Sequence, residues 1–322
     1  MKRNLIAAAA LSALLAGACD RYAGGRQRAQ SGRYIAPDSM GARPRDIATI
    51  RLRKPAAELV ENSAAAMSTS QPGVLFSVND SGNEPLLFAL DTTGANRGVW
   101  RVLGATNVDW ESAAVAPCST RDGASCVYIG DTGDNHGKHP FRVIYRVREP
   151  TASGVRDTVR AERLRYAYED GPHDVEAMYV APSGDIVLIT KRPLAAGGGR
   201  LRPALVFSIA RGAWTHKGIA RAALVDSLPI IPGSAPLRLI TDAALSPDAK
   251  HLAVRTYAQL YIFATDASSG AVNHGLAPST CNLVALGEAQ GEGVTWADNR
   301  GRLAFTSEGK QAPLRLATCP LP

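Results

Sequence analysis

The chain has 322 residues, of which 45% are hydrophobic and 20% charged, and its formal charge is +7. It is too apolar for a disordered protein, and its 30 Gly and 20 Pro supply too many turn-forming residues for a helical bundle. The length fits two average domains, but a β-propeller can reach this size as a single domain.

The first residues predict export from the cell. A short apolar run follows Lys2 and Arg3 and ends in small residues, which is the pattern of a secretory signal peptide over residues 1–18. Residues 15–19 (LAGAC) resemble a bacterial lipobox, and this resemblance implies that Cys19 becomes a lipidated first residue. The alternative is ordinary cleavage before the same residue. We therefore expect a protein of the bacterial cell envelope, periplasmic or at the surface, or else a secreted one.

Residues 19–45 are predicted to be a flexible tether between the lipid and a folded domain, because they are rich in Gly, Ser and Arg. Six cations lie among them: Arg21, Arg26, Arg28, Arg33, Arg43 and Arg45. Beside a lipid anchor they would favour an anionic membrane surface, and a merely solvated linker is the alternative. Since the positive charge gathers here, the basic composition does not indicate a nucleic-acid partner.

The cysteine count fits an oxidising compartment. Removing Cys19 leaves four cysteines, and Cys118 and Cys126 flank a short polar loop that suits a small disulfide. Cys281 and Cys319 are then expected to pair with each other. A metal site built from these thiols is disfavoured, because none of them forms a CxxC pair or has a histidine at ligand spacing.

Residues 46–322 are predicted to be all-β. Short apolar runs alternate with turn-forming residues, as in strands joined by tight connections. The runs cover residues 74–78, 86–90, 127–129, 143–147, 186–189, 205–207, 252–254 and 260–263. One candidate helix, 55–67, is ambiguous because its Ala-rich part also fits the repeat described next.

One unit recurs five times, and each copy opens with an acidic residue that leads a small or apolar strand. The openings are residues 61–65, 111–115, 176–180, 242–246 and 292–296. Repeated four-stranded units predict a single β-propeller with five blades. Six or seven blades remain compatible, because residues 224–240 can contain further strands. A spare strand at 46–53 would complete the last blade and remove its open edge.

Several motifs resemble those of a largely uncharacterised family of exported bacterial β-propeller proteins. They are residues 79–82 (NDSG), 109–111 (DWE), 130–135 (GDTGDN), 173–177 (HDVEA) and 241–243 (TDA). The resemblance covers about residues 58–310. It implies the propeller fold and export, and it implies no particular activity.

The first strand of each propeller blade lines the central channel, so the aligned acids are expected to form a ring. The candidate metal ligands are Glu61, Glu111, Glu176, Asp242 and Glu292, together with Asp109 and Asp174, which lie two residues before two of them. Carboxylates confined in this way raise one another's pKa unless a cation joins them, and oxygen ligands suit Ca²⁺. In the alternative, the acids bind backbone N–H groups at strand ends or pair with arginines.

A second layer of polar residues is expected at one mouth of the channel. It contains Asp80, Asp131, Lys191, Arg255 and Glu308, with Asp134, Asn135 and His173 nearby. These residues either form ion pairs that lock adjacent blades, or Lys191 and Arg255 hold an anion while His173 acts as acid or base. Residues 131–135 can also form a local Ca²⁺ loop or simple Asx turns.

Two functions follow from this pattern. The first is an exported, lipid-anchored propeller that holds Ca²⁺ and binds a small anionic ligand or a protein at one face. The second is a Ca²⁺-dependent hydrolase of a phosphoester or related anionic ester at the channel mouth. The sequence has no GxSxG, Walker, HExxH or Rossmann motif. Buried ion pairs at Lys191 and Arg255 would favour the first function, and their convergence with His173 on an open pocket would favour the second.

Overall fold

The computed structural model describes residues 41–119, 123–191, 203–230 and 238–322. These residues belong to one compact unit, Met40–Pro322. The predicted signal peptide, the candidate lipidation site Cys19 and the tether up to residue 40 lie outside the described residues.

Antiparallel pairing of consecutive strands builds the described chain, which is all-β apart from short 3₁₀ turns. The first run comprises β2 (Ala66–Met67), β3 (Val74–Val78), β4 (Leu86–Asp91) and β5 (Asn96–Leu103). The second comprises β6 (Trp110–Pro117), β7 (Ser125–Asp131), β8 (Arg142–Arg148) and β9 (Val155–Tyr168). The third comprises β10 (Val175–Val180), β11 (Ile186–Thr190), β12 (Ala204–Ile209) and β13 (Ile219–Leu228).

The remaining strands form two further sheets of four. The fourth run comprises β14 (Ile240–Leu245), β15 (His251–Thr256), β16 (Gln259–Ala264) and β17 (Ser279–Asn282). The fifth comprises β18 (Gly291–Trp296), β19 (Arg302–Ser307), β20 (Leu314–Thr318) and β1 (Arg45–Ile50). The strand β1 thus comes from the N-terminal side and pairs with β20, as the spare strand at 46–53 predicts.

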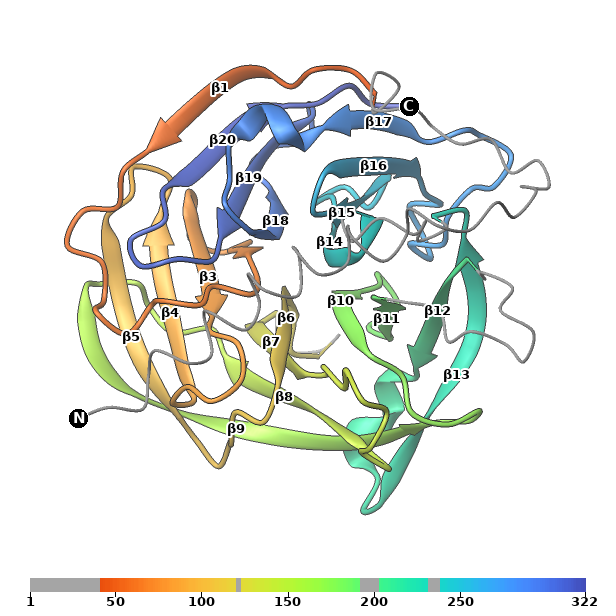
Figure 1. The fold of residues 1–322 in the computed structure, drawn as a ribbon. Helices are drawn as coiled ribbons and strands as arrows, with labels where there is room; N and C mark the ends of the chain where they lie inside the picture. The colour runs from red at the N-terminus through yellow and green to blue at the C-terminus, as the bar shows by residue number, and fades with distance from the viewer. Residues whose placement is uncertain (1–40, 120–122, 192–202, 231–237) are drawn as a thin grey trace, which may run out of the picture. The chain divides into compact units, whose positions relative to one another are not determined.

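The first strands of the five runs contact one another in a closed cycle. The cycle runs from β2 to β6, β10, β14 and β18 and back to β2. Figure 1 shows the sheets arranged around this centre, with the later strands of each run farther out. Consecutive four-stranded antiparallel sheets around a common axis are the arrangement of a β-propeller.

Buried apolar side chains fill the spaces between neighbouring sheets. In one cluster Phe76 of the first run packs with Trp110 and Ile129 of the second, and all three side chains are essentially inaccessible. The other clusters likewise join two adjacent runs. The core is therefore divided among the sheet interfaces, which leaves the ends of the inner strands free to carry polar groups.

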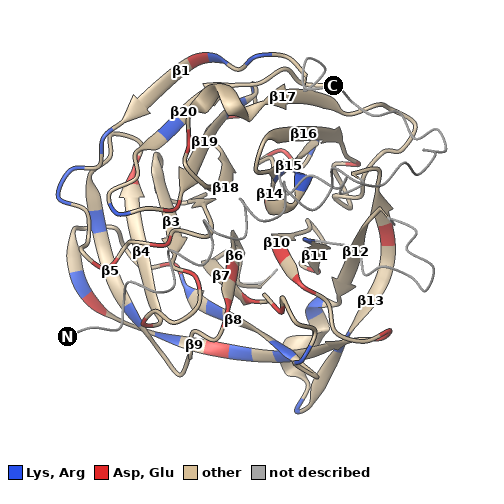
Figure 2. Cartoon of the chain, viewed as in Figure 1, with Lys and Arg blue, Asp and Glu red and all other residues tan. Residues whose placement is uncertain are grey.

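The outer strand β9 links three of the runs. It pairs antiparallel with β8, and in parallel with β5 through residues 155–160 and with β13 through residues 165–168. The result is one twelve-stranded hydrogen-bonded sheet. Figure 2 shows basic residues spaced along β9, whose outward face is exposed.

The candidate helix at 55–67 was a wrong interpretation. These residues contain turns and bends and end in the strand β2. The side chain of Asn79 explains part of this conformation: its Oδ1 accepts hydrogen bonds from the backbone N–H groups of Val60 and Glu61, and its Nδ2 donates to Glu58 O. Backbone groups held from outside in this way are not available for helical hydrogen bonds.

Both predicted disulfides are present. Cys118 pairs with Cys126, and Cys281 pairs with Cys319. The second bond joins β17 to the residue that follows β20, so it ties the fourth run to the fifth. Disulfides are typical of an oxidising, exported environment. In the described part of the chain, no helix has the length and apolar character needed to cross a membrane.

Candidate functional site

The starts of the inner strands bring buried carboxylates to one end of the channel. Glu111, Glu176, Asp242 and Glu292 lie on β6, β10, β14 and β18, and each is 5% exposed or less. Figure 2 shows acidic residues where β10 begins. Glu61 differs, because it is exposed and precedes β2.

Three acidic side chains converge closely. Asp80, Asp109 and Glu111 each offer a carboxylate oxygen, and these oxygens all lie within 4.8 Å of one another. Asp80 follows β3, Asp109 precedes β6 and Glu111 is on β6, so two adjacent runs meet here. We call these three residues the carboxylate cluster.

The electrostatics of the carboxylate cluster disfavour three unpaired negative charges. Burial, together with the charges of Glu176 and Asp80, raises the pKa of Glu111 well above its ordinary value. Burial and the charge of Asp80 raise the pKa of Asp109 to about 6. Within the described residues, no ion pair or hydrogen bond reaches the Glu111 carboxylate. A cation bound among these oxygens would supply the missing positive charge.

The donor set fits a hard cation. It consists of carboxylate oxygens, and no His or Cys belongs to it. Asp80 and Asp109 are partly exposed, so water or a ligand oxygen can complete the coordination. Oxygen-only ligation with six to eight positions is typical of Ca²⁺.

The GDTGDN segment supports this cluster. A Cβ atom on Gly133 would lie 2.5 Å from Asp109 Oδ2 and 2.8 Å from Glu111 Cγ, so only glycine allows both side chains to approach. Asp131 Oδ1 accepts a hydrogen bond from the backbone N of Asp109 at 2.9 Å, and it pairs with Arg142 Nη2 at 2.9 Å. Asp131 therefore holds the backbone of a cluster residue.

Asn107 is a positioning residue that sequence reasoning missed. Its Nδ2 donates to Asn79 O at 3.0 Å and to Asp80 O at 2.8 Å, and its Oδ1 accepts from Trp110 N at 3.1 Å. It therefore ties the turn that carries Asp80 to the strand that carries Glu111. A signal was present in the sequence, since Asn107 lies two residues before Asp109, the first residue of the DWE motif.

Lys191 occupies the channel beside the other acids. Its Nζ lies 2.5 Å from Glu176 Oε1, and both side chains are buried. Burial lowers the pKa of Lys191, but the charges of Glu176 and Glu111 outweigh it and hold this pKa well above its ordinary value. Burial also raises the pKa of Glu176 to about 8, although Lys191 opposes this shift. Lys191 therefore neutralises the charge of Glu176, one of the acids of the predicted ring.

Asp242 binds backbone groups instead of facing a cation. Its carboxylate accepts hydrogen bonds from the N–H groups of Val294 at 2.8 Å, Ala243 at 2.8 Å and Ala65 at 3.4 Å. These contacts connect three runs at the centre of the molecule. This is the alternative role expected for an acid at a strand end.

Glu292 and Glu308 share one amide. Gln290 Nε2 donates to Glu292 Oε1 at 2.9 Å and to Glu308 Oε1 at 2.6 Å. Burial raises the pKa of Glu292 to about 8. Burial and the charges of Asp80 and Glu61 raise the pKa of Glu308 to about 7. Both acids therefore bind protons near neutral pH.

Arg255 and His173 each have protein partners. Arg255 is fully buried, and its guanidinium donates to Gly293 O, Thr306 O and the carboxylate of Glu288. His173 Nε2 lies 2.8 Å from Asp170 Oδ1, and its ring packs between Tyr168 and Phe207. Together with the pairing of Lys191, these contacts favour structural ion pairs over an anion clamp.

The remaining mouth residues are placed around the same loop. Asp134 accepts hydrogen bonds from the backbone N–H groups of Lys138 and His139, four and five residues further along the chain. Asp174 Oδ1 accepts from Asp134 N at 2.9 Å. Asn135 is exposed. These contacts brace the loop that carries Gly133.

Comparisons with known proteins give only matches of low similarity. No protein-family model and no curated protein matches the chain. Among solved structures, a glucose dehydrogenase has a TM-score of 0.46 at 12% identity over 85% of this chain and 99% of its own. The β-propeller domain of Myceliophteria thermophila Cps50 (Swd1) has a TM-score of 0.41 at 13% identity over 85% and 98%.

A third match is to a larger protein. PorZ, a surface component of the type-IX secretion system of Porphyromonas gingivalis, has a TM-score of 0.37 at 13% identity over 80% of this chain. The chain spans only 32% of the length of PorZ. At such identities and TM-scores, these matches carry no statement about activity or site residues.

Proposed function

We propose that this protein is an exported, lipid-anchored β-propeller that binds Ca²⁺ at its channel mouth and presents the bound cation to a ligand or a protein. The observation that carries the proposal is the carboxylate cluster, whose three oxygens lie within 4.8 Å of one another. The burial of Glu111 without a hydrogen-bond partner among the described residues supports it. A divalent cation would resolve the repulsion among these groups.

In this proposal each run of four strands is one blade, which gives five blades, and β1 completes the last of them. The signal peptide and the lipid on Cys19 would place the domain at the cell envelope, and the basic tether would lie against anionic lipid. The two disulfides support an exported location.

The bound ligand would be a small anion or an acidic group of a protein. Because Asp80 and Asp109 are partly exposed, a cation held there would keep coordination positions open for an incoming oxygen. The pairing of Lys191 with Glu176 and of Arg255 with Glu288 supports a binding module over a phosphoester hydrolase, since neither cation is available as an anion clamp.

Calorimetric melting of the full chain in EDTA and in Ca²⁺ tests the cation site. A cation that binds only the folded state raises the melting temperature, and a concentration a hundred times the dissociation constant adds about 2.7 kcal/mol. We expect Ca²⁺ to raise the melting temperature of the unchanged chain. Asp109→Asn and Gly133→Ala should remove most of this shift, the second because its Cβ would displace two cluster side chains.

Matched controls separate the cluster from general effects. Asp266→Asn removes an exposed carboxylate, and Gly218→Ala adds a Cβ where no atom lies within 4 Å. Both variants should keep the full Ca²⁺ shift. A melting temperature that Ca²⁺ leaves unchanged, or a shift of equal size in Asp109→Asn, would overturn the proposed site.

A further inference from the structure

A cavity lies at the C-terminal ends of the inner strands, opposite to the ends that carry the buried acids. Its volume is about 960 Å³, and its walls include residues 113–117 of β6, 178–180 of β10, 243–245 of β14 and 295–296 of β18. The buried acids stand at the starts of the same strands, so the two features occupy opposite ends of the channel. The size is at the upper end of the range for small-molecule sites.

Small side chains keep this cavity open. Ala113, Ala114 and Ala116 line it from β6, and Ala243 and Ala244 line it from β14. A larger residue at Ala114 or Ala244, which are partly exposed, would take up space that the strands enclose. Since the walls are predominantly apolar, the cavity favours a ligand with apolar surface to bury.

Aromatic rings form part of the wall. Tyr128, Trp214 and Trp296 all line the cavity. The ring of Tyr128 meets that of Trp214 edge-on with centroids 6.0 Å apart, and the guanidinium of Arg146 lies 4.1 Å from the centroid of Trp214. Tyr128 and Trp296 are almost fully buried, so the partly exposed Trp214 offers the ring surface that a flat ligand can reach.

Three charged residues line the wall: Arg146, Arg211 and Asp248. Arg146 pairs with Glu162, and Asp248 accepts a hydrogen bond from Ser246 Oγ. The guanidinium of Arg211 is exposed and donates to the carbonyl oxygen of Ser183 at 3.3 Å, and Asp185 Oδ1 accepts from the backbone N–H of Arg211 at 2.8 Å. Among the described residues, this guanidinium has no ion pair.

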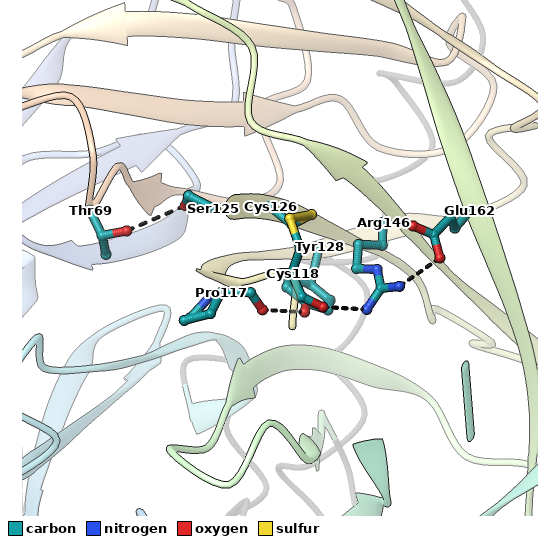
Figure 3. The surroundings of a disulfide bond; sticks show 8 residues. All are labelled: Thr69, Pro117, Cys118, Ser125, Cys126, Tyr128, Arg146 and Glu162. Carbon is teal, nitrogen blue, oxygen red and sulfur yellow. Dashed lines mark hydrogen bonds and ion pairs between the residues drawn. A yellow bond between two sulfur atoms is a disulfide. The ribbon is translucent and has the colours of Figure 1, made fainter. Parts of the chain in front are cut away.

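The rim is fixed in advance by covalent and polar contacts (Figure 3). The Cys118–Cys126 disulfide closes the loop at this end of β6. Tyr128 Oη donates to Pro117 O at 2.9 Å, and Arg146 Nη1 donates to Cys118 O at 2.8 Å. A site that is ordered before binding loses less conformational entropy when a ligand enters.

We propose that this cavity binds a flat aromatic small molecule that carries one anionic group. The ring would lie among the alanines and the aromatic wall, and the anion would pair with Arg211. The site is separate from the carboxylate cluster, so it requires no cation. An aromatic anion meets both the apolar character of the wall and the guanidinium of Arg211, which has no ion pair among the described residues.

Isothermal titration calorimetry of the full chain with two probes of the same ring and opposite charge tests this assignment. The probes are naphthalene-2-carboxylate and naphthalen-2-ylmethylammonium, each titrated in EDTA. We expect saturable one-to-one binding of the carboxylate and binding of the ammonium at least about fivefold weaker. Arg211→Gln should remove this preference, and Arg160→Gln, on the exposed face of β9, should keep it.

Filling the cavity provides the second arm of the test. Ala244→Leu should weaken binding of the carboxylate at least about tenfold, because the added side chain takes the ligand's volume. Ala114→Leu serves the same purpose if the first variant melts at a lower temperature. Absence of saturable binding by the unchanged chain, or unchanged affinity in folded variants with leucine at these positions, would overturn the assignment.

Discussion

At the scale of single residues, the ammonium group of Lys191 decides which channel carboxylates remain available to a cation. It pairs with Glu176 at 2.5 Å and lowers the pKa of Glu292 against the effect of burial. The carboxylate cluster contains Glu111, whose pKa Lys191 also lowers from a distance. Lys191 forms its ion pair with Glu176, so among the described residues the cluster acids have no ion pair.

Removing that ammonium group should destabilise the fold. Lys191→Met leaves Glu176 buried without its partner, and breaking a buried ion pair in this way costs about 3 kcal/mol. The double variant Lys191→Met/Glu176→Gln should regain most of this loss, because it removes the unpaired acid as well. Urea denaturation gives the free energy of unfolding of each variant.

The exposed residue Lys250 provides the matched control for this pair. Lys250→Met should change the free energy of unfolding by less than about 0.5 kcal/mol. A double variant as unstable as the single one would show that the ion pair does not account for the loss.

Glu292 makes stability depend on pH. The folded chain keeps its proton up to about pH 8, while the ordinary pKa is 4.5, so the folded state binds more protons between these values. The stability that this group contributes is therefore fully present below about pH 4.5 and is lost as the pH rises to 8. Each unit of pKa difference corresponds to about 1.4 kcal/mol.

Glu292→Gln should flatten this decline, because the amide does not ionise. We expect the loss of free energy of unfolding between pH 5 and 8 in EDTA to shrink by about 1 kcal/mol or more. Glu84→Gln, at an exposed side chain, should leave the decline unchanged. A decline equally steep in Glu292→Gln would contradict the assignment.

The sequence revealed the acids of the channel but not their partners. The repeat alignment placed Glu111, Glu176, Asp242 and Glu292 at equivalent inner positions, and the structure brings all four to the channel buried. Their different roles depend on contacts between runs, such as the backbone N–H groups of Ala65 and Val294 that bind Asp242. Contacts between residues so far apart in the chain produce no local sequence pattern from which these roles could be predicted.

At the scale of elements, the strand β1 protects the edge of β20. Their pairing joins residues 45–50 to residues 314–318. Without β1, the N–H and C=O groups of β20 would face solvent, and an open strand edge promotes association with other chains. The position of β1 therefore matters for solubility as well as for stability.

Two truncations test this role. A chain that lacks residues 1–40 should remain monomeric, with the melting temperature of its parent. A chain that lacks residues 1–52 should melt at least about 5 °C lower, because it loses the ladder to β20, and it should associate in size-exclusion chromatography. Equal melting temperatures for both truncations would show that β1 contributes nothing to the sheet.

Strands with two buried faces were predictable, and the long outer strand β9 was not. The apolar runs at 74–78 and 86–90 became β3 and β4, whose residues are nearly all buried. The sequence of β9 is rich in arginine and mostly exposed, so it lacks an apolar run. Its strand conformation comes from pairing with three neighbours, which no window of the sequence contains.

At the scale of the whole molecule, the two ends of the channel have opposite chemistry. Buried acids gather where the inner strands begin, and alanines and aromatic rings line the cavity where the same strands end. Four of the inner strands, β6, β10, β14 and β18, change along their length from acidic to small and apolar residues. The repeated inner strands thus place a regular set of backbone positions at both ends of the channel, and the side chains at those positions differ between the two ends.

The long outer strand β9 has a consequence for how the ring opens. Because β9 pairs with β5, β8 and β13, the first three runs cannot separate unless the hydrogen bonds of these strand pairs break. The fourth and fifth runs form separate sheets, so thermal opening of the ring should occur mainly where these two runs meet their neighbours. Packed side chains and the Cys281–Cys319 disulfide, instead of strand pairing, hold the runs together there. Three of the five runs thus form one continuous sheet, and the amide hydrogens of these three runs should exchange with solvent as one cooperative unit.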